Sequence, residues 1–216
     1  MANDFSGDPN CKAYWRFEDG ALTVDSIGTN TLTDYNTVGV DTVDFQEGAA
    51  CADFEEDNVE AFHCDDADLD VGFPLRSDDV TKDFSIASFF KCESSGSGCL
   101  FNKSRERTGF RSLKFIIIES FGNMTLQFYS GYNSGASYEV LKHESVLSVA
   151  NWYFACLTYQ NSDRAYRIHI YDIDAGVVLG SDKTGTVSNE IYVAAGHFAL
   201  EHRRAHHWNI NHYMTA

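Results

Sequence analysis

The carboxylates between residues 53 and 70 are the first candidates for chemistry, because nine acidic residues and no Lys or Arg lie in this stretch. Glu55, Asp57 and Glu60 could supply a nucleophile and an acid for sugar hydrolysis. The retaining mechanism of that reaction needs two carboxyl groups about 5–5.5 Å apart. The residues between them are poor strand formers, so the sequence offers little to fix this geometry. We therefore expect the three carboxylates not to converge.

Three tyrosines surround a stretch rich in Gly, Ser and Asn, and they form a candidate ligand-binding rim. Tyr129, Tyr132 and Tyr138 can offer ring faces for stacking against sugars, and Asn133 adds an amide. Loops with such adaptable polar groups often carry binding functions. The alternative interpretation is a plain hairpin loop whose tyrosines pack on the edge of the fold.

Two of the six cysteines stand at either end of a flexible Gly- and Ser-rich turn. Cys92 and Cys99 flank Glu93–Gly98, which separates two predicted strands. If these strands form a hairpin, the two Cβ atoms can approach to about 3.8 Å, as a disulfide requires. We predict this disulfide. The alternative is that most of the cysteines are free buried thiols, which behave as small apolar side chains.

The elements that position these groups are runs of aromatic and β-branched residues with period-two alternation, as half-buried strands require. No stretch shows a sustained helical period, and no composition shift divides the chain. We therefore predict one all-β domain over residues 1–216. Spacing by two places each of the following pairs on one strand face, so the eight residues are expected to line or adjoin one core: Trp15 and Phe17, Phe84 and Ile86, Trp152 and Phe154, Ile168 and Ile170.

In these runs the chain resembles a laminin-G-like domain of the concanavalin A-like lectin/glucanase superfamily. Trp15–Gly20 and the turn Asp25–Gly28 resemble the opening of such a domain, and Asp83–Lys91 resembles its strongest strand. Trp152–Tyr159 and Tyr166–Gly176 resemble its late hairpin. The resemblance implies a two-sheet antiparallel β-sandwich of jelly-roll type. This fold is a scaffold for binding, and only some of its members are enzymes.

The resemblance also implies a calcium site at the early turn. Asp25, with oxygens of Gly28 and Asn30, matches the turn that binds calcium in many laminin-G-like domains. The acidic partner in the closing strand is missing here, and Asn209 or Asn211 would have to replace it. Calcium is therefore a candidate cofactor, with a solvated acidic loop as the alternative.

The same resemblance gives a second interpretation of Glu55, Asp57 and Glu60, whose spacing matches the acidic pattern of retaining β-glucanases. Alignment with the family places them in the turn after Phe54, however, and not on the strand that carries catalysis. We therefore predict a protein that is not an enzyme.

Residues 201–216 depart from the closing-strand pattern and are interpreted as an atypical C-terminal tail. Arg203, Arg204 and Trp208 are residue types enriched at interface hot spots, and the arginines contrast with an acidic body. We expect this tail to contact other copies or a larger assembly. The rival interpretation is that it merely completes the edge of the sandwich through Ile210.

The formal net charge of −16 bears on partners and location. Such a charge disfavours nucleic acids and anionic membranes, and no apolar stretch reaches the ~18 residues of a membrane span. The N-terminus lacks the features of a signal peptide. A lectin-like domain made in the cytoplasm that carries disulfides suits a virion surface protein, such as a phage capsid decoration, whisker or fibre. It would bind other virion proteins or copies of itself, and host glycans. The alternatives are a secreted carbohydrate-binding module and a β-glucanase or other polysaccharide-degrading enzyme.

Overall fold

The computed structural model describes residues 5–55, 58–105, 110–201 and 208–215. Within these ranges the regular structure is almost entirely antiparallel β-strand, beside the short 3-10 helices η1 (Phe5–Gly7) and η3 (Asp66–Asp68). The all-β prediction is therefore confirmed. No helix in these ranges has the length and apolar character needed to cross a bilayer.

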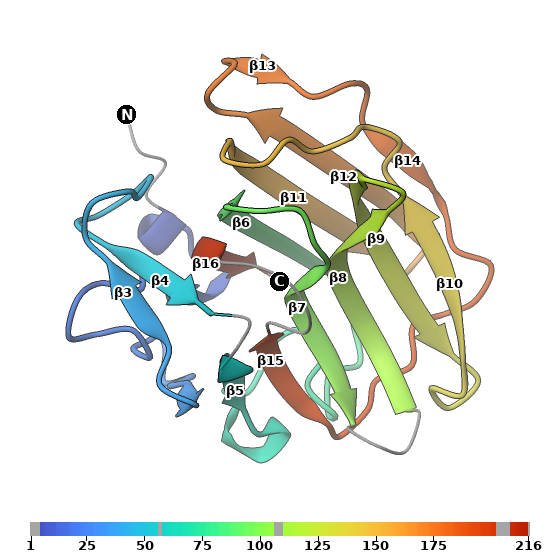
Figure 1. Cartoon of the computed structure of the whole chain (residues 1–216). Coiled ribbons are helices and arrows are strands. Elements are labelled where there is room, and N and C mark those ends of the chain that lie inside the picture. Colours follow the sequence, from blue (N-terminus) through green and yellow to red (C-terminus); the bar gives the residue numbers. More distant parts are fainter. Residues whose placement is uncertain (1–4, 56–57, 106–109, 202–207, 216) are drawn as a thin grey trace.

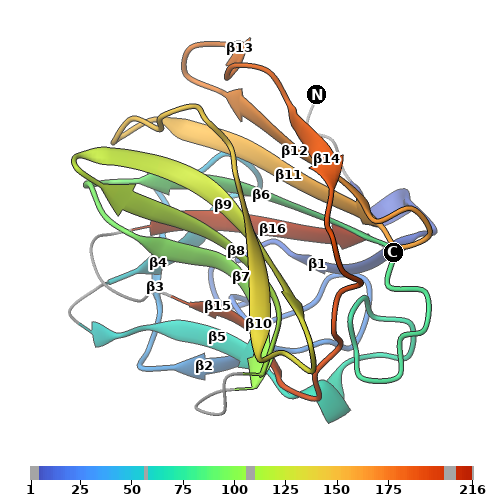
Figure 2. The same cartoon turned by 90° about the vertical axis from the view of Figure 1, so that its right-hand side faces the viewer.

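One layer is a nine-stranded sheet, called sheet A (Figures 1 and 2). Its main path runs in the order β13 (Val177–Val178), β12 (Ala165–Asp172), β11 (Trp152–Gln160), β6 (Phe84–Cys92), β16 (Trp208–Thr215), β4 (Cys51–Phe54) and β3 (Gly39–Asp41). In addition, β1 (Cys11–Trp15) pairs with β16, and β14 (Lys183–Thr186) pairs with β12.

The second layer is a seven-stranded sheet, called sheet B, whose green to yellow strands stand in front in Figure 2. Its order is β10 (Ser137–Lys142), β9 (Asn123–Tyr132), β8 (Phe110–Ser120), β7 (Gly98–Arg105), β15 (His197–Glu201), β5 (Ala61–Cys64) and β2 (Thr33–Tyr35). Both sheets are antiparallel, which confirms the predicted two-sheet sandwich.

The core lies between the sheets, and strand alternation decides which residues reach it. In sheet A, Phe84 and Ile86 face inward, and so do Ile168 and Ile170. Trp15 and Phe17 pack in the same cluster, and six of the eight predicted core residues are therefore confirmed: Trp15, Phe17, Phe84, Ile86, Ile168 and Ile170. Sheet B contributes alternate residues of β8 and β9, among them Phe115 and Phe128.

Trp152 and Phe154 do not face this core, because the alternate residues Tyr153 and Ala155 of β11 do. The inward residues of β11 are thus one position away from the predicted ones, and a difference of one position exchanges the inner and outer faces of a strand. Trp152 is nevertheless buried, and its indole Nε1 donates to Asp44 Oδ1 at 2.7 Å. Phe154 packs at 5.1 Å, centroid to centroid, against Phe89 on the outer face of sheet A.

The predicted Cys92–Cys99 disulfide is absent, since both residues are free cysteines. The connection between them is not a hairpin: Cys92 ends β6 in sheet A, whereas Cys99 lies in β7 of sheet B. Cys92 points into the core, and burial raises the pKa of its thiol far above the ordinary value. The other four cysteines are free as well, as the alternative interpretation expected, although only Cys51, Cys64 and Cys92 are buried.

The predicted tail contains a central strand of sheet A. Trp208–Thr215 forms β16, which pairs with β6 along its whole length. Its other edge pairs with β4 near Trp208 and with β1 near Thr215. The rival interpretation is therefore right that this segment completes the sandwich, but β16 lies in the interior of sheet A and not at its edge. Arg203, Arg204 and the side chain of Trp208 lie outside the described residues.

Candidate functional site: the outer face of sheet B

The outer face of sheet B, turned away from the core, gathers the tyrosines that the sequence singled out. On β9, Tyr129 and Gln127 alternate with the core residues Leu126 and Phe128 and therefore point outward. Cross-strand pairing places the following residues in one row across six strands: Val140, Tyr129, Lys114, Asn102, Ala199 and His63. We call this face the B face.

Tyr129 and Tyr138 form an aromatic pair on the B face, with ring centroids 5.2 Å apart and planes inclined by 34°. Tyr138 stands opposite Gly131 on β9, so no side chain separates it from the ring of Tyr129. The Tyr129 hydroxyl donates to Gln127 Oε1 at 3.3 Å. Tyr138 is 43% exposed, so the pair offers an accessible aromatic surface to a ligand.

Tyr132 and Asn133 do not join this pair. They begin the turn between β9 and β10, where the carbonyls of both accept hydrogen bonds from Gly135 and Ala136. Asn133 has a φ of 52°, in the left-handed region that suits a tight turn. The structure therefore brings two of the four predicted ligand-binding residues together and leaves two at the end of the hairpin.

Sequence reasoning missed the polar neighbours of the aromatic pair. Lys114 lies directly opposite Tyr129 on β8, and Asn102 lies opposite Lys114 on β7. The Ser104 hydroxyl donates to Asn102 Oδ1 at 2.7 Å, which orients the amide. The alternation of Lys114 with Leu113 and Phe115 was the available signal that this side chain faces outward.

The predicted calcium turn forms a dense hydrogen-bond cluster, the early-turn cluster. Asp25 Oδ1 accepts the N–H groups of Tyr14 (3.0 Å) and Ile27 (3.1 Å). Asn30 Nδ2 donates to Asp25 Oδ2 at 2.8 Å and to Asp70 Oδ2 at 3.1 Å. Sequence reasoning did not place Asp70 at this turn, because Asp70 belongs to the distant acidic run.

Hydrogen bonds from Thr29, the residue beside Asn30, hold Asp70 in the cluster. Thr29 donates through its hydroxyl and, at 2.8 Å, through its backbone N–H, and these bonds lower the pKa of Asp70. A Cβ on Gly28 would lie 2.6 Å from Asp25 Oδ2 and 2.7 Å from Asp70 Oδ2. A glycine is therefore required where the two carboxylates approach each other.

The cluster suits calcium in the kind of its oxygens but not in its arrangement. Two carboxylate oxygens and the Lys12 carbonyl converge on one point, and the Asn30 NH₂ group occupies that point as a donor to all three. Calcium takes six to eight oxygen ligands. No group of three or more His, Cys, Asp or Glu side chains able to hold a metal occurs in the described part of the chain. As folded, these residues do not fit the ion, and calcium stays a prediction.

Replacing Asn30 with Ala should lower the free energy of unfolding by about 2–4 kcal/mol, because the buried Asp25 carboxylate and the partly buried Asp70 carboxylate lose a shared donor. Thermal or urea unfolding measures this loss. Asn189→Ala, which removes one exposed hydrogen bond to Glu139, should cost below about 0.5 kcal/mol. Equal losses in both variants would contradict the role assigned to the Asn30 amide.

The same unfolding experiment, carried out in calcium and in EDTA, distinguishes a calcium site from a solvated acidic loop at this turn. If calcium binds, the wild-type Tm should be higher in calcium than in EDTA, and Asp70→Asn should abolish the difference. An unchanged wild-type Tm would contradict the calcium prediction.

Of Glu55, Asp57 and Glu60, the structure shows the surroundings of Glu60 most fully. Glu60 is buried, and its carboxylate accepts the Glu55 N–H at 2.7 Å and Asn58 Nδ2 at 3.0 Å. The Glu60 side chain therefore stabilises the turn in which Glu60 lies. Asp57 lies outside the described residues.

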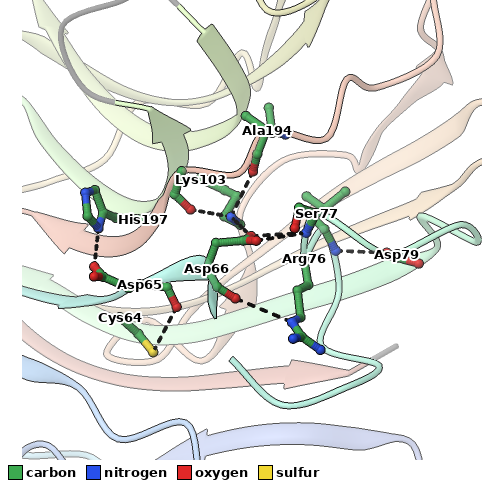
Figure 3. Close-up of polar contacts among 12 residues, drawn as sticks. Cys64, Asp65, Asp66, Arg76, Ser77, Asp79, Lys103, Ala194 and His197 are labelled. Atoms are coloured by element: carbon green, nitrogen blue, oxygen red, sulfur yellow. Dashed lines mark hydrogen bonds and ion pairs between the residues drawn. The ribbon is translucent and has the colours of Figure 1, made fainter. Parts of the chain in front are cut away.

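Lys103 is a buried charge at one end of the sandwich, and Figure 3 shows its surroundings. Its Nζ donates to Asp66 and to the carbonyls of Ala194 (3.0 Å) and Gly196. Burial lowers the pKa of this ammonium, against the opposing effect of Asp66. All three N–H donors are used, so Lys103 anchors the segment before β15 to η3 and has no donor left for a ligand.

No protein-family model matches the sequence, and no curated protein matches it. Solved structures do resemble the fold. A structure of botulinum neurotoxin type C, described with two ganglioside molecules, has a TM-score of 0.64 and 12% identity over 95% of this chain. The binding domain of botulinum neurotoxin DC in complex with SialylT has a TM-score of 0.60 and 12% identity, also over 95% of this chain.

The enzymatically active domain of tailspike protein 2 from bacteriophage CBA120 has a TM-score of 0.59 and 11% identity over 86% of this chain. The chain spans 47% of the length of each of the two toxin chains and 29% of the tailspike chain. At these identities the likeness concerns the fold alone. The chain therefore has a β-sandwich fold that also occurs in parts of larger toxins and phage tailspikes.

Proposed function

We propose that this chain is a non-enzymatic, laminin-G-like module that binds glycans as part of a virion surface structure, such as a capsid decoration, whisker or fibre. The observation that carries the proposal is the Tyr129–Tyr138 pair, an accessible aromatic surface bordered by the polar side chains of Gln127 and Lys114. Sugar-binding sites combine apolar rings with a few placed polar groups.

The structural neighbours support this proposal. The toxin structures were described with two gangliosides in one case and with SialylT in another, and the tailspikes are phage proteins. The same sandwich thus serves proteins that meet glycans and proteins of virions. The turn role of Glu60 supports a module without hydrolytic carboxylates.

A Tyr129→Ala variant tests the binding function. The wild type should bind at least one saccharide on a printed array of neutral and acidic glycans. The variant should raise the Kd about five- to twelvefold, since one aromatic contact contributes about 1–1.5 kcal/mol. Isothermal titration with that saccharide measures the change.

Phe121→Ala is the matched control. Phe121 is fully exposed at the turn between β8 and β9, about 25 Å along β9 from Tyr129. Its loss should leave the Kd unchanged. Absence of binding to every saccharide, or equal weakening by both variants, would contradict the proposed function. Peptide mapping of purified virions tests the proposed location.

A further inference from the structure

The charges of the B face are segregated in an otherwise acidic protein. The chain has 32 Asp and Glu residues against 16 Lys and Arg. Yet Lys114 and Lys142 point outward from β8 and β10, because each alternates with a residue facing the core side, Leu113 and Leu141 respectively. The described part of β7, β8, β9 and β10 places no carboxylate on this face.

The two carboxylates of these strands point to the other side and are already engaged. Glu139 precedes the outward Val140 and accepts the Ser188 N–H at 2.9 Å. Glu119 accepts the Gly122 N–H at 2.6 Å in the turn between β8 and β9. Neither can neutralise a lysine on the B face, and the described ion pairs include neither Lys114 nor Lys142.

Lys114 stands where it can reach a group held on the aromatic pair. It is the direct cross-strand neighbour of Tyr129, so their Cβ atoms lie about 5 Å apart. On its other side lies Asn102, which is buried and accepts the Ser104 hydroxyl. A ligand ring that rests on Tyr129 and Tyr138 therefore has one cation at its edge.

Lys142 lies farther along the same face. It pairs with Gln127, whereas Tyr129, two residues on, pairs with Lys114. Across the sheet the two lysines are two strands apart, and along the strands they are two residues apart. These spacings put their Cα atoms about 12 Å from each other. They can serve different units of an extended ligand.

We propose that the B face selects carboxylated saccharides. One acidic sugar ring stacks on Tyr129 and Tyr138, its carboxylate binds the Lys114 ammonium, and Lys142 receives the carboxylate of another unit. The inference rests on the proposed glycan-binding function and adds the ligand class. A phosphate backbone fits less well, because among the described side chains of β7 to β10 two lysines face it from a protein of net charge −16.

Three acidic polymers are suitable probes: polygalacturonate, hyaluronan and polysialic acid, each beside its carboxyl-reduced form, in which an alcohol replaces the carboxylate. The wild type should bind at least one acidic form about tenfold or more tightly than its reduced form, because a charge-assisted hydrogen bond is lost on reduction. Lys114→Gln should remove most of that advantage, and Lys142→Gln part of it. Lys183→Gln, which deletes a lysine of sheet A, should leave it intact.

The outcomes separate this inference from the proposed function. Binding that depends on Tyr129 but is equal for acidic and reduced polymers overturns the inference and keeps the glycan-binding function. Equal binding of polyacrylate, a carboxylated polymer without sugar rings, also overturns it, because charge alone would then suffice. If none of these polymers, acidic or reduced, binds in a way that Tyr129→Ala weakens, the inference fails, and the glycan array alone decides whether the proposed function survives. Circular dichroism confirms that each variant is folded.

Discussion

A chain that ends at Leu200 should not fold. The truncation removes β16, which pairs with β6 over its whole length and joins both β1 and β4 to the rest of sheet A. Without it sheet A separates into three parts, with β1 on its own, and the edges of β1, β4 and β6 lose their backbone partners inside the molecule. Far-UV circular dichroism and urea unfolding should show no cooperative transition.

Two variants make this expectation specific. A chain that lacks only Ala216 should unfold like the full chain. Tyr213→Pro leaves the length unchanged but removes one backbone donor from a position paired with both Tyr14 and Ala87, and should cost about 3 kcal/mol or more. A folded truncated protein with altered assembly would instead support the interface role predicted from the sequence.

Replacing Lys103 with Met should lower the free energy of unfolding by about 3–5 kcal/mol, because it leaves the partly buried Asp66 carboxylate without its cation. The carbonyls of Ala194 and Gly196 lose a donor as well. In a domain of this size the loss corresponds to a fall in Tm of about 10 °C. Differential scanning calorimetry at neutral pH measures it.

Lys82→Met is the matched control, because Lys82 pairs with Glu190 at the surface. Exposed ion pairs contribute about 0–1 kcal/mol, so this variant should differ little from wild type. The double variant Lys103→Met with Asp66→Leu should cost less than Lys103→Met alone, since no partly buried carboxylate is then left unpaired. Additive losses in the double variant would refute the pairing.

The fold class could be predicted from alternation, but the orientation of individual strands could not always be. Trp152, Tyr153, Phe154 and Ala155 are apolar on both faces of β11, so a period of two does not tell inside from outside. The physical reason is that the outer face of sheet A carries its own apolar cluster around Tyr14. Both faces of this strand are therefore packed.

Contacts between segments that lie far apart in the chain could not be predicted from the sequence either. The turn between Cys92 and Cys99 has the composition of a hairpin, yet it crosses from one sheet to the other, and no local signal distinguishes these cases. Asp70 joins Asp25 only because the fold brings the two segments together. Lys114 was overlooked because the apolar run that follows it resembles a fully buried strand.

The central position of β16 also has a consequence for biosynthesis. Its hydrogen-bonded neighbour β1 is the first strand to leave the ribosome. Cys11 in β1 therefore gains its pairing partner, Thr215, only after Thr215 has been synthesised. A nascent chain therefore carries the unpaired edges of β1, β4 and β6 throughout translation. Long-range pairing of this kind slows folding and leaves open edges available to other chains. Slower synthesis at low temperature, or a chaperone that shields strand edges, should therefore raise the yield of recombinant protein.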